Sequence, residues 1–300
     1  MPAWNEINQE IDALSAADAP DQIRIKYLAE LESKVQRPII GYYSGWLHKR
    51  DAQGRVHPAC EIGDLDMNGF MAVVHGLPRD RGLDLILHTP GGGIEATRAI
   101  VEYLYKMFGR DIRAIVPQMA MSAGTMIVCA CKEVLLGKHS CLGPTDPHIR
   151  GFAAMGILAE VDRAIQEIKE EPIKAHLWQQ VFAKYPPAFI TDCERSVEGV
   201  KSMVTEWLAA NMVVNDAAPA AKANAIIAEL MNYSGTTEHG HHFLADKCTA
   251  IGLNVRPIEE RQDVQEAILS VHHAYMASFA RTNSIKIIDN SFGQTWTVSG

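Results

Sequence analysis

The hydrophobic positions near the start of the chain follow a helical spacing. Between residues 4 and 35, apolar side chains recur at helical intervals and charged residues fill the other faces. The pattern breaks near Ala19 and Pro20. Such a stripe is typical of an amphipathic helix that packs on one face. The pattern therefore predicts an N-terminal helical arm over residues 1–37.

The centre of the chain alternates short apolar runs with longer helical stretches. Residues 83–88 (LDLILH) form a continuous apolar run, which is typical of a strand buried on both faces. After a glycine-rich turn, residues 94–108 carry apolar side chains at helical spacing. Strands that alternate with helices indicate an α/β fold with a mainly parallel sheet. The same pattern predicts further strands at 38–43, 112–116 and 134–136, and further helices at 64–77 and 122–131.

The pattern changes in the second half of the chain. Residues 151–232 predict long helices broken at Pro172 and at Pro186-Pro187. Residues 241–258 return to a short helix and a strand, and a helix over 264–280 precedes an extended tail.

These patterns suggest three regions. After the arm, we predict a core over residues 38–260 that carries a helical insertion at about 151–232. A C-terminal helix and tail over 261–300 follow, and we expect them to serve oligomerisation.

Composition narrows the class of protein. The 300 residues are 47% hydrophobic and 21% charged, which is close to the globular average. The 28 basic and 36 acidic residues give a formal net charge of −8, whereas a nucleic-acid binder would usually carry a basic surplus. The six cysteines have neither the CxxC spacing of metal sites nor the pattern of a disulfide scaffold. We therefore expect no nucleic-acid partner and a reduced, cytoplasmic compartment.

No membrane anchor is expected from the sequence. The longest apolar stretch, residues 119–136, contains Lys132 and Glu133, and a spanning helix needs about 20 apolar residues. The N-terminus lacks the basic and apolar regions of a signal peptide.

The first candidate site is the glycine loop, residues 89–93 (TPGGG), which follows a predicted strand and precedes a helix. Glycines allow the backbone N–H groups to face a ligand, and the helix dipole favours negative charge there. A phosphate-binding loop is one interpretation, although no Lys-Ser/Thr follows the glycines. An oxyanion hole built from the N–H groups of Gly91 and Gly92 is another. A plain turn between strand and helix is the third.

The second candidate is Ser122 in the segment MSAGT, which follows the next predicted strand. Its small neighbours leave room for a substrate carbonyl, and the N–H of Ala123 is placed to donate to an oxyanion while Ser122 Oγ attacks. The alternative is that Ser122 only caps the following helix. Loops that follow parallel strands meet at the carboxyl edge of the sheet, so the glycine loop and Ser122 are expected to lie together.

Three segments in order, LDLILHTPGGG, AMSAGT and LGKHSCLGPTDP, resemble the serine dehydrogenase proteinase family. That family is related to signal peptide peptidase A and, more distantly, to the Clp protease proteolytic subunit and the crotonases. The resemblance is dense over residues 64–147 and weaker over 239–259 and 272–293. It implies a Clp/crotonase-type spiral of parallel-sheet ββα units with additional helices, and a homo-oligomer. It also implies a Ser122 nucleophile with an oxyanion hole from the glycine loop and Ala123.

Two residues are candidates for the general base. His148 follows the GPTDP turn, close to where the Clp proteolytic subunit carries its histidine, and imidazole titrates near neutrality. Asp146 is placed either to orient His148 or to cap the turn. Lys174 is the alternative, as in the Ser–Lys dyad of signal peptide peptidase A, because Pro172, Ile173 and the following residues offer an apolar setting that lowers a lysine pKa. The sequence leaves the choice between His148 and Lys174 open.

Other potential ligands and nucleophiles fit structural roles better. The histidine-rich segment at residues 238–242 lacks HEXXH spacing, so we expect it to be structural or to line the substrate site. Cys129 and Cys131 lie on a predicted buried helix and are expected to fill the core. The sequence predicts neither a metal nor a cofactor.

The favoured hypothesis is a serine peptidase, independent of ATP, that acts on peptides or unfolded proteins. A crotonase-like acyl-CoA enzyme would use the same oxyanion geometry without a serine nucleophile. A scaffold with a decayed site on the same fold is the third hypothesis.

Overall fold

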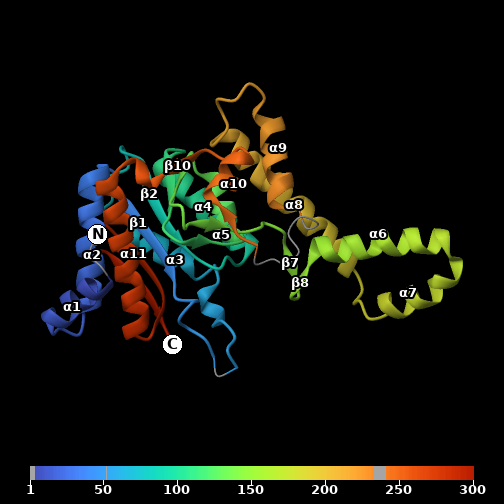
Figure 1. Cartoon of the computed structure of the whole chain (residues 1–300), viewed down its shortest axis with the longest axis horizontal. Coiled ribbons are helices and arrows are strands. Elements are labelled where there is room, and N and C mark those ends of the chain that lie inside the picture. The colour runs from blue at the N-terminus through green and yellow to red at the C-terminus, as the bar shows by residue number, and fades with distance from the viewer. Residues whose placement is uncertain (1–3, 52, 233–240) are drawn as a thin grey trace.

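The fold is built on a seven-stranded sheet with the strand order β10-β5-β3-β2-β1-β11-β12. A computed structural model describes residues 4–51, 53–232 and 241–300. Strands β10 to β1 of this order run parallel, and β11 and β12 join the β1 edge in antiparallel fashion (Figure 1). The strands are β1 Ile39–Ser44, β2 Leu83–His88, β3 Ile112–Val116, β5 Glu133–Leu136, β10 Val255–Pro257, β11 Ser284–Asn290 and β12 Thr295–Ser299.

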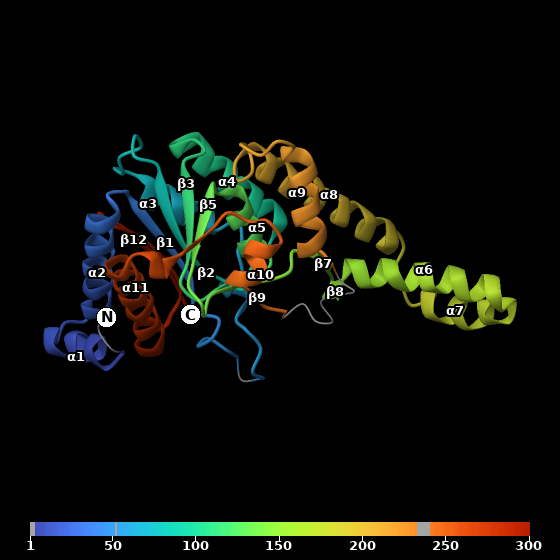
Figure 2. The ribbon, with the colours of Figure 1, turned by 45° about the horizontal axis from the view of Figure 1, so that its top comes forward.

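Helices cover both faces of the sheet (Figure 2). One face carries α1 (Trp4–Leu14), α2 (Ala19–Val35) and α11 (Gln262–Arg281). None of the described helices combines the length and the apolar composition that crossing a membrane requires. The opposite face carries α3 Asp66–Val74, α4 Ile94–Phe108, α5 Ala123–Ala130, α8 Phe189–Ala210 and α9 Pro219–Leu230.

Alternation along the strands divides the core into two. Tyr43 and Ile86 pack in the cluster of α2 and α11, whereas Tyr42, Leu85 and Leu87 pack in the cluster of α4 and α5. Successive side chains of a strand point to opposite faces, so a strand buried on both sides is apolar throughout. The Clp/crotonase-type α/β architecture expected from the sequence is therefore confirmed.

Short elements complete the region around the sheet. A three-stranded sheet joins β4 (Met119–Ala120), β6 (Cys141–Leu142) and β9 (Phe243–Leu244), and α10 (Ala245–Ala250) follows it. Strands of two residues carry no readable periodicity, and the sequence analysis missed them. The other short elements are the hairpin of β7 His148–Ile149 and β8 Phe152–Ala153, and the 3₁₀ turns η1 Pro58–Cys60, η2 Pro172–Lys174 and η3 Ile258–Glu260.

Part of the predicted helical insertion projects from the body of the molecule. Helices α6 (Ala154–Glu170) and α7 (Ala175–Phe182), joined by η2, form this projecting hairpin (Figures 1 and 2). The predicted breaks at Pro172 and Pro186-Pro187 separate α6, α7 and α8. The domain boundaries remain a prediction, but β11 and β12 of the C-terminal tail belong to the main sheet.

His88 ends β2 inside a buried aromatic cluster. Its side chain is fully buried, and neither ring nitrogen has a hydrogen-bond partner in the described structure. The rings of Tyr43, Trp46 and His272 surround it at centroid distances of 5.7, 5.9 and 5.4 Å. Desolvation, assisted by the charge of His48, lowers the pKa of His88 to about 3.

We predict that His88→Phe reduces the sensitivity of the fold to acid. A histidine in the unfolded chain has a pKa near 6.5. Between about pH 6.5 and 3, His88 therefore binds a proton in the unfolded chain but not in the folded one. Stability is therefore lost as the pH falls, by about 2 kcal/mol for this group between pH 8 and 5. Urea unfolding of wild type and variant at both pH values measures the difference. An equal loss in the two proteins would contradict the assignment.

Candidate active site

Ser122 lies in a strained turn between β4 and α5. Its backbone has φ 51° and ψ −118°, in the region that side-chain-bearing residues rarely adopt. Such a conformation costs about 1–3 kcal/mol and persists only where the surroundings enforce it. The Ser122 side chain makes no capping hydrogen bond to α5. Ser122 thus stands at the N-cap position of α5 without capping the helix through its side chain.

The glycine loop lies directly against this turn. A Cβ added at Gly91 would lie 2.6 Å from Ser122 Cβ and 3.0 Å from Ala123 N, and Gly91 itself has φ 98°. The contact is therefore open only to a residue without a side chain. Gly92, with φ 155°, approaches the backbone of Ile62 in the same way. The backbones of the glycine loop and of the segment around Ser122 are thus in direct contact.

Thr89 holds the two backbones in register, a role that the sequence analysis missed. Its N–H donates to Met119 O at 3.2 Å, and its carbonyl accepts from Met121 N at 3.0 Å. Its Oγ1 accepts from Gly91 N–H at 3.1 Å. A threonine hydroxyl that bonds a backbone group two residues on is a recognised local motif, so the Thr-Pro-Gly order was the available signal.

The three expected oxyanion donors differ in their surroundings. The Gly91 N–H is engaged by Thr89 Oγ1. Within the described residues, the N–H groups of Gly92 and Ala123 donate no hydrogen bond to a turn, a loop or a side chain. Ala123 also begins α5, whose first N–H groups carry partial positive charge.

A cavity of about 470 Å³ brings the main candidates together. Its walls come from the glycine loop, the Ser122 turn, and β7 with the preceding turn. Ser122 is partly exposed there and His148 is exposed. Asp146 is buried two residues before His148. The cavity is lined by Glu61, Pro90, Gly91, Gly92, Gly93, Ile94, Ser122, Met126, Pro147 and His148.

Lys174 is placed elsewhere within the chain. It ends η2 at the outer end of the projecting hairpin and does not line the cavity (Figure 1). Its Nζ lies 3.0 Å from Glu171 and 3.9 Å from Glu167. The hydrogen bond to Glu171 and these acidic charges raise the pKa of Lys174, whereas a basic catalyst needs a lowered one. The structure therefore unites Ser122 with His148 but not with Lys174.

The remaining sequence candidates lie outside this cavity. His241 and His242 are exposed beside β9, and residues 233–240, including His239, lie outside the described residues. Within the described part of the chain, no three or more His, Cys, Asp or Glu side chains are grouped to hold a metal ion. Burial raises the pKa of both Cys129 and Cys131, as expected for core thiols.

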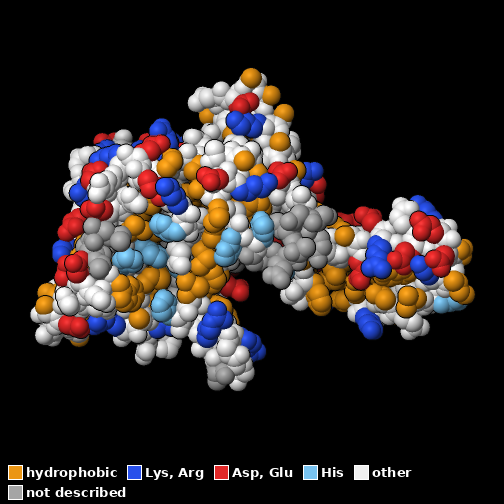
Figure 3. Space-filling view, in the orientation of Figure 1, with side chains coloured by type: hydrophobic (Ala, Val, Ile, Leu, Met, Phe, Trp, Pro, Cys, Tyr) orange, Lys and Arg blue, Asp and Glu red, His pale blue; other side chains and the backbone are white. Residues whose placement is uncertain are grey.

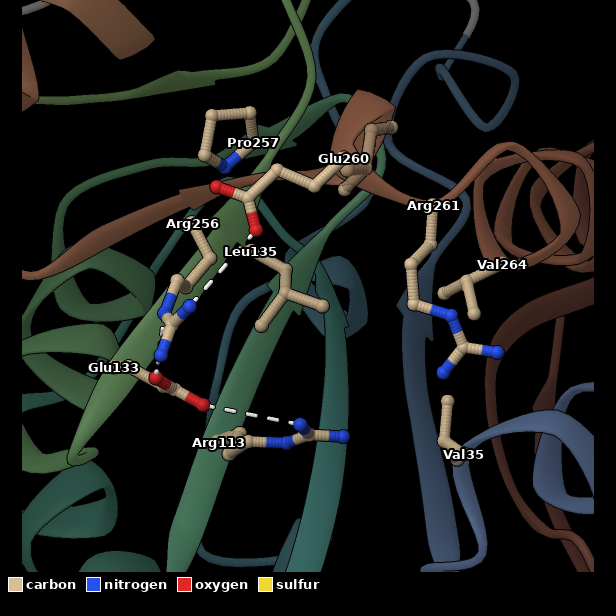
Figure 4. A pocket seen from close by; sticks show the side chains of 10 residues that line it. Val35, Arg113, Glu133, Leu135, Arg256, Pro257, Glu260, Arg261 and Val264 are labelled. Atoms are coloured by element: carbon tan, nitrogen blue, oxygen red, sulfur yellow. Dashed lines mark hydrogen bonds and ion pairs between the residues drawn. The ribbon is translucent and has the colours of Figure 1, made fainter.

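A second groove, of about 230 Å³, is lined by residues of β3, β5 and β10 together with η3 and the ends of α2 and α11 that lie beside them (Figure 4). Arg113, Glu133, Arg256 and Glu260 pair with one another in it, whereas Arg261 pairs with Asp263. Arg113 lies 3.8 Å from Glu133, and Arg256 lies 3.3 Å from Glu133 and 3.9 Å from Glu260. This groove offers no nucleophilic side chain. The cavity at Ser122, where the strained serine, the glycine loop and His148 meet, is the candidate active site.

Comparisons with known proteins bear on the family of the chain. The ClpP-like SDH-type serine proteinase family matches residues 60–257, a range that includes the glycine loop, Ser122 and His148. An uncharacterized protein of Methanocaldococcus jannaschii, MJ0137, is 31% identical over 144 residues, which are 47% of this chain and 48% of that protein. A second, MJ1495, is 32% identical over 108 residues, which are 36% of this chain and 37% of that protein. The match thus spans about half the length of MJ0137 and less of MJ1495.

The matched range covers most of the chain and contains the cavity, the strained serine and the glycine loop that packs against it. The chain belongs to the ClpP-like SDH-type serine proteinase family.

Proposed function

We propose that this protein is a serine peptidase in which Ser122 attacks the carbonyl carbon of a peptide bond. The observation that carries the proposal is the convergence of three groups on one cavity. These are a serine held at φ 51° without a capping bond, backbone N–H groups beside it, and a histidine on the facing strand. An observed backbone outlier in a cavity is a sound starting point for a functional hypothesis.

In the proposed reaction, His148 takes the proton from Ser122 Oγ as the serine attacks. The N–H groups of Gly92 and Ala123 donate to the oxyanion of the tetrahedral intermediate. His148 then gives the proton to the leaving amine, and water releases the acyl group from Ser122 by the reverse sequence. His148 is preferred to Lys174 because it lines the same cavity as Ser122, and because the acidic neighbours of Lys174 stabilise its charged form.

The cavity favours unfolded peptide substrates. Ile94, Met126 and Pro147 give one part of its wall an apolar character that suits an apolar side chain. A peptide carbonyl reaches Ser122 only if the chain on both sides of it is extended, as in an unfolded segment. The proposed hydrolysis is independent of ATP; these 300 residues carry no P-loop sequence, so any ATPase would have to be a separate chain.

A homo-oligomer is part of the proposal. The projecting hairpin leaves Ile173 73% and Leu177 61% exposed, and apolar side chains run along it (Figure 3). Exposed apolar surface of this kind, on a hairpin that projects from the molecule, marks a site of association between protein chains. A second copy of this chain is the expected occupant, because oligomers are usually formed from identical chains.

We predict that Ser122→Ala lowers the hydrolysis of casein by about 10³-fold or more, because no other group in the cavity replaces the nucleophile. A fluorophosphonate probe should label the wild type and leave the variant unlabelled. Ser196→Ala, on α8 outside the cavity, is the matched control and should retain both casein hydrolysis and probe labelling. Equal turnover by Ser122→Ala and wild type would refute the nucleophile.

We predict that His148→Gln lowers kcat by about 10²–10⁴-fold, as expected when a general base is lost. Lys174→Met, which removes the competing candidate, should leave kcat within a factor of about two. The pH dependence of kcat between pH 5 and 9 should be the same in Lys174→Met as in wild type. The assignment fails if the lysine variant is the inactive one.

We predict that Thr89→Val lowers kcat about 10-fold with little change in KM, because the loop then loses the bond to Gly91 N–H. Thr89→Ser keeps that hydroxyl and should restore most of the rate. Steady-state kinetics on a short fluorogenic peptide give both constants. A serine variant as slow as the valine variant would show that packing, rather than the hydrogen bond, is what matters.

A further inference from the structure

A buried ion pair lies behind the glycine loop, outside the cavity. Lys286 on β11 is 2% exposed and Asp66, the first residue of α3, is 1% exposed. Lys286 Nζ donates to the two carboxylate oxygens of Asp66 at 2.7 and 2.8 Å. Tyr42 on β1 donates its hydroxyl to the same carboxylate at 2.8 Å. Both charges are thus withdrawn from water and fully engaged.

Both members of the ion pair are also hydrogen-bonded to one short backbone segment, residues 61–63. Lys286 Nζ donates to the carbonyl oxygen of Glu61 at 2.6 Å. The N–H of Gly63 donates to Asp66 Oδ2 at 3.0 Å. The ammonium and the carboxylate therefore hold the backbone on either side of Ile62.

Ile62 in turn is bonded to the glycine loop on both of its backbone groups. Its N–H donates to the carbonyl oxygen of Gly91 at 2.8 Å, and its carbonyl accepts from the N–H of Gly93 at 2.8 Å. A parallel bridge between Ile62 and Gly92 places the two segments side by side. The segment 61–63 is thus the support on which the loop rests.

This support decides where the N–H of Gly92 points. The Gly91 carbonyl and the Gly92 N–H belong to one planar trans peptide unit, so they point in opposite directions. With the carbonyl bonded to Ile62, the N–H faces away from Ile62. Glycine on both sides makes this peptide easy to rotate once the bond is lost.

A buried ion pair contributes little net stability, because removing both charges from water costs free energy that offsets their attraction. Replacing such a pair by apolar residues of similar size is often neutral or stabilising, whereas removing one partner is costly. What Lys286 and Asp66 supply here, and an apolar pair would not, is directed bonds to the backbone of Glu61 and Gly63.

We propose that Lys286 and Asp66 are positioning residues for the oxyanion hole. They fix segment 61–63, which orients the Gly91–Gly92 peptide so that the Gly92 N–H faces the attacking serine. This inference rests on the hydrolase function proposed above. Lys286 lies beyond residues 60–257, the range that matches the family, whereas Asp66 and segment 61–63 lie within it.

The test compares two buried ion pairs on the same strand. Lys286→Met keeps the length of the side chain and removes the charge. Arg24→Met removes the partner of Asp289, a pair at 2.7 Å that is equally buried and has no hydrogen bond or ion pair to segment 61–63. Both variants lose a buried pair, so both are expected to lose stability, and circular dichroism selects a temperature at which both remain folded. Asp66→Asn is the milder variant if Lys286→Met does not fold.

Two measurements then test the proposed positioning role, namely steady-state kinetics and amide hydrogen exchange. Lys286→Met should lower kcat on a short peptide at least about 10-fold with KM within a factor of two, while Arg24→Met keeps kcat. Amide hydrogen exchange should be faster in peptides covering residues 61–63 and 90–93 in Lys286→Met alone. Unchanged exchange there, or an equal loss of kcat in both variants, overturns the proposal. A wild type without hydrolysis or probe labelling refutes the proposed function instead, and exchange still tests the positioning of the loop.

Discussion

The structure depends on one close approach, that of the backbone of Gly91 to the turn at Ser122. No side chain fits between them, because a Cβ on Gly91 would lie 2.6 Å from that of the serine. The unusual φ of Ser122 and the positive φ of Gly91 are two sides of this contact. The Ser122 conformation is unfavourable for an isolated peptide, whereas glycine adopts a positive φ readily. Hydrogen bonds of Thr89, directly after β2, hold both segments.

The parallel sheet makes that contact possible. Strand β2 leads into the glycine loop, and β3 leads through β4 to Ser122. Since β2 and β3 are adjacent and parallel, their following loops emerge at the same edge. Thr89 then links the loops in front, and residues 61–63 support the glycine loop from behind. The chemistry at the edge therefore depends on a framework that is almost wholly buried.

Local pattern predicted the elements well where burial is continuous. The strands at 83–88 and 112–116 and the helix at 94–108 match the structure, because apolar runs and helical stripes report burial directly. The family and its fold followed from three short motifs. The same reasoning failed for Lys174, whose apolar neighbours Ile173 and Leu177 are exposed in the described chain rather than packed around it.

The parts that sequence could not predict are those set by distant contacts. The turn at Ser122 is hydrogen-bonded to Thr89 through Met121, and the proposed choice of oxyanion donors rests on which N–H that threonine engages. The role of Lys286 depends on β11 pairing with β1, although more than 200 residues separate the lysine from Asp66. No periodicity within β11 reports which backbone its lysine reaches.

The position of β11 has a consequence for the order of synthesis. During translation β1 emerges well before β11, the strand that pairs with its free edge. Until then the 61–63 segment has no lysine to hold it, and the peptide it orients is unsupported. The nascent chain therefore carries Ser122 well before it carries the lysine that the proposed positioning of the glycine loop requires.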